Sequence, residues 1–381
     1  MLKIPCWCGA SLIAALFASL PAAAAVPIPA PPDLPVRAHI LIDFDSGRVL
    51  ASLNADQKLE PASLTKLMTA YAVFVALREG RLQLTDDIVI SEKAWRMEGS
   101  RSFIEVGKHI PAEVLIKGMI VQSGNDASIA LAERVGGSET GFVSMMNEYA
   151  RRLGMANTHF TNATGLPDPA LHITARDMAT LARALIREFP QYYKWYSLRE
   201  FVWNEIRQPN RNGLLSRDPS VDGMKTGFTD PAGYCLVSSA LRNRMRLISV
   251  VLGSASVKAR EDASEALLNY GYAFFETVKV HAAGDTILKP RVYKGASADV
   301  GATLQRNVFV TVGRGEGVKV QATATLREPL IAPLQTNVAI GELAVRDGAD
   351  LVAKVPLYPG RAVAAGGWWA RTTDTVALWF R

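Results

Sequence analysis

The 381-residue sequence predicts a mixed α/β domain followed by a small all-β domain. In the first part of the chain, β-prone segments flank a run of helical segments, which is typical of a sheet covered by helices. The composition then changes near Thr277 to short β-branched runs separated by glycine and proline. Because the length also suits two domains, we place the first at residues 37–275 and the second at residues 277–363.

The N-terminal segment, residues 1–25, has the pattern of a signal peptide. Lys3 is followed by an apolar run from Leu12 to Leu20 and by Ala23-Ala24-Ala25, the order of a charged region, an apolar region and a cleavage site. The apolar run is too short to span a bilayer comfortably, and an uncleaved anchor is the alternative. We therefore expect an exported protein in which residues 26–36 form a proline-rich linker.

The first domain opens with a predicted hairpin, because the β-prone segments of residues 38–54 surround the turn signal Asp45-Ser46-Gly47. Apolar periodicity and flanking glycines predict helices over residues 61–78, 112–121, 126–135, 142–153 and 175–189. We expect two strands and a closing helix over residues 233–240, 245–252 and 261–275. In the second domain the β-branched runs predict strands over residues 307–312, 318–326 and 338–344.

Charge and composition exclude several classes of function. The net charge of +6 is spread along the chain without a Lys/Arg block, so we expect no nucleic-acid partner. The histidines show no metal-ligand spacing, so neither a metal nor another cofactor is expected. After the signal-like segment no apolar run reaches ~18 residues, the length that marks a spanning helix.

Three short motifs carry the predicted chemistry. They are Ser63-Leu64-Thr65-Lys66, Ser123-Gly124-Asn125 and Lys225-Thr226-Gly227. A serine hydroxyl becomes a good nucleophile when a base takes its proton, and a lysine three residues further along a helix lies on the same face. Burial and a second cation, Lys225, would lower the pKa of Lys66 so that its neutral form acts as that base.

The second and third motifs suit the remaining steps of an acyl transfer. Ser123 lies at a predicted helix–helix junction and can relay a proton to a leaving amine, while Asn125 can orient Lys66 and contact a substrate amide. Lys225 and Thr226 can bind a carboxylate, and Gly227 leaves room for a substrate backbone. We expect the backbone N–H groups of Ser63 and Phe228 to stabilise the oxyanion.

In this order the motifs match S-x-x-K, S-x-N and K-T-G, the signature of penicillin-binding proteins and class A β-lactamases. Longer segments also resemble the low-molecular-mass penicillin-binding proteins of the serine-type D-alanyl-D-alanine carboxypeptidase family (peptidase S11-like). They are residues 123–133, 165–166, 174–177, 212–215 and 221–229. The resemblance covers residues 35–275 and implies a penicillin-recognising serine transpeptidase/β-lactamase-like catalytic domain, and the layout of the second domain resembles the C-terminal module of the same family. It also implies that Arg260 and Arg211 bind the substrate carboxylate.

The resemblance implies an enzyme that removes the terminal D-alanine from peptidoglycan pentapeptide stems and is acylated by β-lactam antibiotics. A D,D-endopeptidase that cleaves cross-links is the nearest alternative. A class A β-lactamase is less favoured because no glutamate followed by asparagine stands between Ser123 and Lys225 to activate a deacylating water. A non-catalytic wall-binding protein is disfavoured by the intact motif residues.

The C-terminal segment, residues 366–381, has a second distinctive pattern. On a helix its large apolar residues share one arc, opposite Arg371, Asp374 and Arg381. The residues of that arc are Trp368, Trp369, Val376, Trp379 and Phe380. Tryptophans beside arginine are typical of an interfacial membrane helix, so we expect a periplasmic protein peripherally attached to the inner membrane. The alternative is a last strand packed on the β domain.

Overall fold

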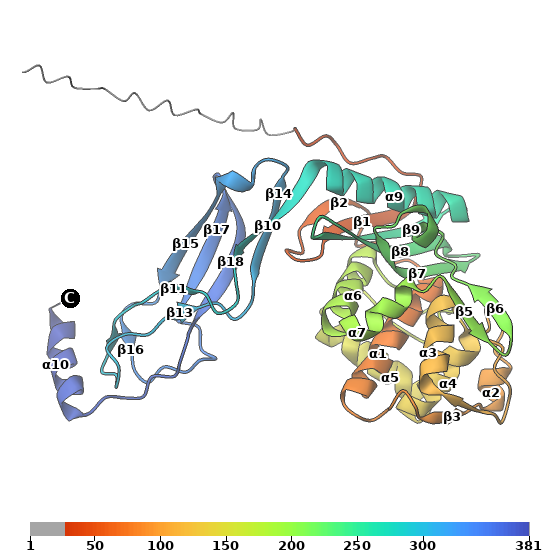
Figure 1. Ribbon diagram of the computed structural model, residues 1–381, viewed down its shortest axis with the longest axis horizontal. Helices are drawn as coiled ribbons and strands as arrows, with labels where there is room; N and C mark the ends of the chain where they lie inside the picture. Colours follow the sequence, from red (N-terminus) through yellow and green to blue (C-terminus); the bar gives the residue numbers. More distant parts are fainter. Residues whose placement is uncertain (1–26, 381) are drawn as a thin grey trace, which may run out of the picture.

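The computed structural model describes residues 27–380, so the predicted signal peptide and Arg381 lie outside the described residues. A five-stranded antiparallel sheet of order β2-β1-β9-β8-β7 organises the first domain (Figure 1). Its strands are β1 (Ala38–Asp43), β2 (Val49–Leu53), β7 (Val221–Thr229), β8 (Gly233–Arg242) and β9 (Met245–Ser254). Strand β7 forms one edge of the sheet.

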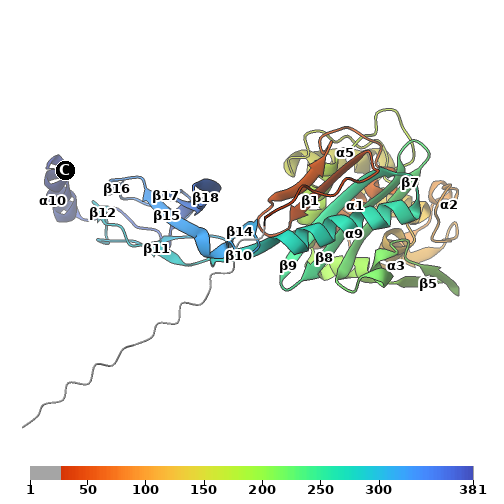
Figure 2. The ribbon, with the colours of Figure 1, turned by 90° about the horizontal axis from the view of Figure 1, so that it is seen from above.

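Helices cover both faces of this sheet. Helix α9 (Val257–Phe274) lies along one face together with the short helix α8 (Leu214–Arg217), and the larger group of helices around α1 (Lys66–Arg78) forms a cluster on the other face (Figures 1 and 2). Strand β1 shows the consequence, because Ile40 and Ile42 join the core on the cluster side whereas Leu41 joins the core beneath α9. Both faces are therefore covered, and every residue of β1 is buried, including the polar residues His39 and Asp43.

The helical cluster surrounds α1, whose side chains are buried from Lys66 to Ala76. Side chains of Ser138 and Thr174 cap the starts of α5 and α6. Besides α8 and α9, the helices of the first domain are α1 (Lys66–Arg78), α2 (Glu92–Trp95), α3 (Ala112–Val121), α4 (Asn125–Gly136), α5 (Glu139–Arg152), α6 (Ala175–Glu188) and α7 (Pro190–Tyr193), with 3-10 turns η1 (Ala62–Thr65) and η2 (Lys194–Ser197). Two small hairpins are β3 (Asp87–Val89) with β4 (His109–Pro111) and β5 (Glu200–Trp203) with β6 (Ile206–Pro209).

The second domain is built from strands around its own apolar core. A five-stranded sheet of order β11-β13-β18-β17-β15 is accompanied by the pairs β10–β14 and β12–β16. The strands are β10 (Phe275–His281), β11 (Thr286–Leu288), β12 (Val292–Tyr293), β13 (Ala302–Thr303), β14 (Val308–Gly313), β15 (Val320–Leu326), β16 (Leu330–Ile331), β17 (Gly341–Asp347) and β18 (Asp350–Pro359), with the 3-10 turn η3 (Gly317–Lys319). The predicted fold class, a mixed α/β domain followed by a small β domain, is confirmed.

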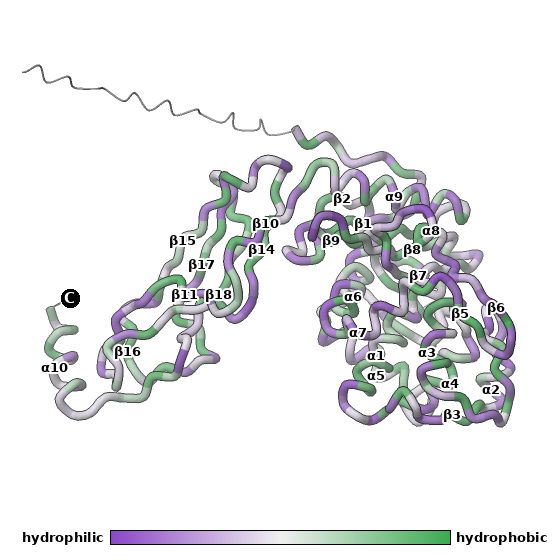
Figure 3. Tube along the Cα trace, in the orientation of Figure 1, coloured by the Kyte–Doolittle hydropathy of each residue, from purple (hydrophilic) through white to green (hydrophobic). Residues whose placement is uncertain are grey.

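Hydropathy follows burial along the chain. Most residues of the central strands β8 and β9 are buried, and these strands are coloured mainly as hydrophobic in Figure 3. The peripheral loops are largely hydrophilic. The C-terminal residues form helix α10 (Trp368–Trp379) at the far end of the second domain (Figure 1). The alternative of a last strand is therefore wrong.

Candidate active site

The three sequence motifs meet at one cavity of about 440 Å³ in the first domain. Ser63 comes from η1, Ser123 and Asn125 from the α3–α4 junction, and Thr226 with Gly227 from edge strand β7. The other lining residues are Gly99, Ser100, Thr164, Gly165, Leu166, Arg211, Phe228, Thr229, Tyr234, Val257 and Arg260. Lys66 and Lys225 do not line this cavity, and both are almost completely buried.

Lys66 contacts the predicted nucleophile directly. Its ammonium Nζ donates to Ser63 Oγ at 3.0 Å and to the carbonyl oxygen of Thr164 at 2.7 Å. Ser63 belongs to the 3-10 turn η1 rather than to α1 itself, and residues three apart eclipse each other in such a turn. The S-x-x-K spacing therefore produces the expected serine–lysine contact.

Burial controls the charge of both lysines. Burial, assisted by the positive charge of Arg211 and opposed by the carboxylate of Asp126, lowers the pKa of Lys66 to about 7. Burial also lowers the pKa of Lys225 well below its ordinary value, and the charges of Lys66, Arg211 and Arg260 add to that shift. The repulsion between the two ammonium groups is mutual, and Arg211 disfavours the charged form of both lysines.

Ser123 and Asn125 hold different positions at the α3–α4 junction. Ser123 has a left-handed backbone with φ of 69°, and its buried Oγ has no hydrogen-bond partner in the described part of the chain. Asn125 Nδ2 donates to the carbonyl oxygen of Glu98 at 2.6 Å. Asn125 therefore fixes the loop that carries Gly99 and Ser100 and does not make the expected contact with Lys66, whose second acceptor is Thr164.

Gly227 allows β7 to lie against the turn that carries the nucleophile. A Cβ atom at this position would lie 3.1 Å from the carbonyl oxygen of Pro61 and 3.2 Å from the backbone nitrogen of Ser63. The glycine thus accommodates η1 as well as leaving space at the cavity. Because β7 is an edge strand, alternate N–H groups of its backbone remain unpaired with β8, and Phe228 on this strand lines the cavity beside Ser63.

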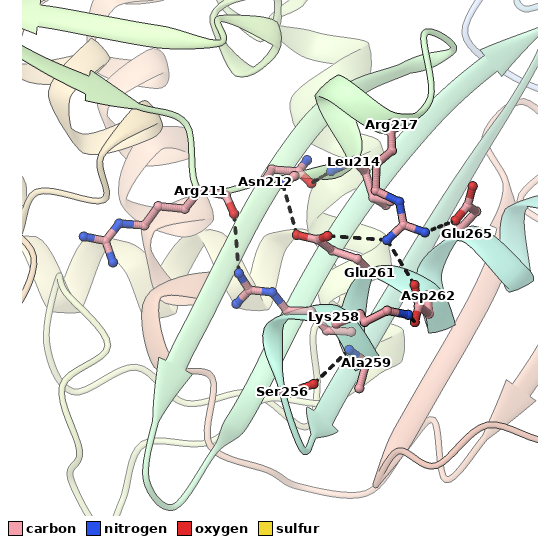
Figure 4. Close-up of polar contacts among 12 residues, drawn as sticks. Arg211, Asn212, Leu214, Arg217, Ser256, Lys258, Ala259, Glu261, Asp262 and Glu265 are labelled. Atoms are coloured by element: carbon pink, nitrogen blue, oxygen red, sulfur yellow. Dashed lines mark hydrogen bonds and ion pairs between the residues drawn. The ribbon is translucent and has the colours of Figure 1, made fainter.

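The two arginines implied by the family resemblance also reach the cavity. Arg260 is 5% exposed, which excludes a surface position at the start of α9, and its guanidinium donates to the carbonyl oxygens of Gly227 at 3.3 Å and Arg211 at 3.4 Å. The Arg211 side chain extends away from this contact (Figure 4) and lines the cavity. Burial lowers the pKa of both arginines. The cavity therefore concentrates positive charge near Ser63.

Three residues support the site through contacts that the sequence does not indicate. Thr164 contributes a backbone carbonyl, which every residue has, and the next residue is Gly165, where a Cβ atom would lie 1.8 Å from the carbonyl oxygen of Ala62. Asp126 is fully buried and accepts backbone N–H groups of Ser102 and Ala127. Gly165 and Asp126 lie in the sequence segments that resemble the family. Those segments did not indicate that Gly165 packs against the nucleophile turn or that Asp126 binds the loop between α2 and α3.

Residues 25–256 match the family of D-alanyl-D-alanine carboxypeptidases, and residues 275–365 match the C-terminal domain of penicillin-binding protein 5. The D-alanyl-D-alanine carboxypeptidase DacC of Escherichia coli is 43% identical over 92% of this chain and 89% of its own length. Penicillin-binding protein 5 from Haemophilus influenzae superposes with a TM-score of 0.83 at 42% identity, covering 88% of this chain and 99% of that one. Penicillin-binding protein D2 from Listeria monocytogenes in the ampicillin-bound form gives a TM-score of 0.59 at 30% identity over 63% of this chain and 98% of that one.

A serine–lysine pair in a cationic cavity, on a sheet enclosed by helices, defines a serine enzyme of the penicillin-binding class. The chain belongs to the D-alanyl-D-alanine carboxypeptidase family, peptidase S11. This membership confirms the family that the motifs indicated. Within residues 27–380 no group of three or more His, Cys, Asp or Glu is arranged to hold a metal ion.

Proposed function

We propose that this protein removes the terminal D-alanine from peptidoglycan pentapeptide stems through an acyl-enzyme on Ser63. The observation that carries the proposal is the 3.0 Å contact between Lys66 Nζ and Ser63 Oγ beside a cationic cavity. A pKa of about 7 leaves a large neutral fraction of Lys66 at neutral pH, as a general base requires. The family membership and the matching carboxypeptidases support the same activity.

The proposed acylation uses the residues in sequence. Neutral Lys66 accepts the hydroxyl proton of Ser63 while Oγ attacks the carbonyl carbon between the two D-alanines. The backbone N–H groups of Ser63 and Phe228 stabilise the resulting oxyanion. Ser123, whose Oγ has no hydrogen-bond partner among residues 27–380, passes a proton to the departing amine as the C–N bond breaks. Water then hydrolyses the ester to release the shortened stem and restore Ser63.

The substrate carboxylate accounts for the remaining cations. Lys225, Thr226, Arg211 and Arg260 are the proposed contacts, and Thr226 and both arginines line the cavity. A bound carboxylate would favour the charged form of Lys225 and so offset the burial that lowers its pKa. We therefore assign the neutral state to Lys66, which contacts Ser63, and the charged state to Lys225 in the substrate complex.

β-Lactam antibiotics should acylate the same serine. Opening a β-lactam ring leaves the former amide nitrogen tethered to the acyl group, so no leaving group departs and the ester blocks Ser63. The sequence contains no glutamate–asparagine pair in place to speed deacylation. We infer that penicillin is an inhibitor rather than a rapidly hydrolysed substrate.

Release of free D-alanine from a diacyl-D-Ala-D-Ala peptide tests the proposed activity. The protein should release D-alanine, and Ser63→Ala should abolish both release and labelling by fluorescent penicillin. Thr180→Ala is a matched control, because the hydroxyl of this partly buried residue on α6 donates to the Arg176 carbonyl oxygen within its own helix, away from the cavity. Absence of D-alanine release from the unaltered protein, or release that survives in Ser63→Ala, would contradict the proposal.

We also propose that the mature protein is periplasmic and attached to the inner membrane through residues 366–381. The large apolar residues of α10 support attachment, because Trp368, Trp369 and Trp379 are 67%, 73% and 80% exposed. Asp374 fixes the opposite side of the helix by accepting from Arg291 at 2.9 Å and from the backbone N–H of Lys294 at 2.5 Å. Within residues 27–380 no helix is long and apolar enough to cross a bilayer.

Vesicle binding tests the attachment. The protein should co-sediment with vesicles that contain anionic phospholipid, and replacing Trp368, Trp369 and Trp379 by serine should abolish co-sedimentation while D-alanine release persists. Exposed Val318 on η3 provides a control, since Val318→Ser removes an exposed apolar residue from another part of the second domain. Equal sedimentation of the triple variant and the unaltered protein would contradict the attachment.

A further inference from the structure

Glu261 is a buried carboxylate next to the cavity arginine Arg260 and has no place in the chemistry described above. It lies in the first turns of α9 and is 8% exposed. One oxygen, Oε1, accepts the backbone N–H of Gly213 at 3.2 Å, and the other, Oε2, lies 3.5 Å from Nη1 of Arg217 (Figure 4). Burying a carboxylate is costly unless its oxygens are paired, and Glu261 is paired with the segment that follows Arg211.

Consecutive residues of α9 thus hold both sides of Asn212. Arg260 donates to the carbonyl oxygen of Arg211 at 3.4 Å, and Glu261 accepts from the N–H of Gly213. The fit is close, because a Cβ atom at Gly213 would lie 2.4 Å from Glu261 Oε1. The Arg211 side chain then leaves the loop in the opposite direction, toward the cavity.

Arg217 completes this arrangement from α8, directly after the loop. It forms ion pairs with Glu261, Asp262 and Glu265, so α8 is tied to α9 at several points. Asp262 and Glu265 are more exposed than Glu261 and contact only Arg217 and Lys258, not the loop backbone. Of these three acidic residues, Glu261 is the one that bonds to the backbone of the loop, and the loop backbone determines where the Arg211 side chain starts.

We propose that Glu261 is a positioning residue that sets the selectivity of the enzyme for substrates with a free terminal carboxylate. It holds the Arg211 loop on α9 so that Arg211 and Arg260 face the same cavity at a fixed separation. This inference rests on the proposed carboxypeptidase function and adds to it the element that orients the carboxylate-binding arginines. It predicts that loss of Glu261 weakens discrimination between a peptide acid and the corresponding peptide amide, with little effect on the serine–lysine chemistry.

The test is the ratio of kcat/KM for a diacyl-D-Ala-D-Ala acid to kcat/KM for its C-terminal amide. Loss of a buried, charge-assisted hydrogen bond predicts that Glu261→Ala lowers this ratio by about tenfold, mainly through KM for the acid. Glu261→Gln keeps an acceptor for Gly213 and should lower the ratio by about threefold. Asp262→Asn, which removes a neighbouring pair of Arg217 without touching the loop, should leave the ratio unchanged.

A second variant disrupts the contact between Glu261 and Gly213 by a change in the loop. Gly213 has φ outside the left-handed region, so Gly213→Ala is compatible with the backbone and its effect comes from the clash with Glu261. It should lower the acid-to-amide ratio as Glu261→Ala does, and the double variant should show no further decrease, since each single change removes the same contact.

The outcomes separate this inference from the proposed function. If the unaltered protein releases no D-alanine, the proposed function is contradicted, and the acid-to-amide ratio cannot be measured. If the unaltered protein is active and Glu261→Ala and Gly213→Ala both retain its acid-to-amide ratio, the inference is overturned and the function stands. Should Glu261→Ala fail to fold, an unchanged ratio in Glu261→Gln and Gly213→Ala overturns it equally.

Discussion

At the scale of single residues, the site depends on a lysine that burial makes partly neutral. The Lys66 ammonium is 1% exposed and has Ser63 Oγ and the Thr164 carbonyl oxygen as acceptors. Taking an ammonium out of water favours its neutral form, and the positive charge of Arg211 acts in the same direction. A general base whose pKa lies near the working pH combines a useful neutral fraction with enough basicity to accept a proton.

The pH dependence of acylation tests this electrostatic account. The second-order rate constant for labelling by a β-lactam should rise through a pKa of about 7, because only neutral Lys66 can accept the Ser63 proton. Arg211→Gln removes a charge that lowers the Lys66 pKa, so the rising limb should move to higher pH. Arg217→Gln, an arginine outside the cavity, should leave the limb in place. If the rising limb of the pH profile is unchanged or moves to lower pH in Arg211→Gln, the account is contradicted.

The sequence predicts side chains of this site better than its backbone contacts. Ser63, Ser123 and Thr226 line one cavity, as their motifs indicated, because hydroxyl and ammonium groups at set spacings are visible in the sequence. The second acceptor of Lys66 could not be predicted, since it is a carbonyl oxygen 98 residues away. For the same reason the bond from Asn125 to the Glu98 carbonyl oxygen, in place of a contact with Lys66, could not be predicted.

At the scale of elements, two segments pack tightly against the nucleophile turn η1. Strand β7 approaches η1 at Gly227, and the loop before α6 approaches it at Gly165. Helix periodicity predicted most of the helical cluster, and residues 112–121 agree with α3 at both ends. It did not predict that residues 62–65 form a separate 3-10 turn, because that turn depends on contacts with β7 and the Gly165 loop.

Gly165→Ala tests this packing. A methyl group there would meet the Ala62 carbonyl oxygen at 1.8 Å and would add strain at φ of 85°, so we expect a loss of about 2 kcal/mol or more in the free energy of unfolding together with slow penicillin labelling. Gly80→Ala is the matched control, because φ is 71° there with no atom within 4 Å, and only the conformational cost of about 1 kcal/mol should remain. Equal destabilisation and equal labelling in the two variants would refute the role of the close contact.

At the scale of the whole molecule, a partly buried polar network joins the two domains. Asp43, at the end of β1, accepts from Ser46 at 2.9 Å and from Thr277 at 2.7 Å. Thr311 of the second domain shares hydrogen bonds with Ser46 at 2.7 Å and with Thr277 at 2.9 Å, and its carbonyl oxygen accepts from Arg48 at 2.5 Å. This junction could not be predicted from the sequence, because hydrogen-bonded partners such as Ser46 and Thr311 are 265 residues apart and have no distinctive spacing.

Thr311→Val should weaken the junction at nearly constant volume. The methyl group cannot bond to Ser46 or Thr277, and the loss of the two hydrogen bonds of buried Thr311 should cost about 1–3 kcal/mol, measured as a lower Tm of the full chain. Thr325→Val on β15, at an exposed position, should leave Tm nearly unchanged. D-alanine release per folded molecule should persist in both variants, because the junction lies outside the catalytic cavity. An unchanged Tm in Thr311→Val would show that the network does not stabilise the assembly of the domains.

The central claim is that Ser63 carries the acyl group in a cavity assembled from the three motifs. Mass spectrometry of the penicillin-treated protein after proteolysis measures this most directly. The account predicts one adduct, on the peptide that contains Ser63, and none in Lys66→Met, where the base is absent. An adduct on another residue, or an unmodified Ser63 peptide in protein that still releases D-alanine, would contradict it.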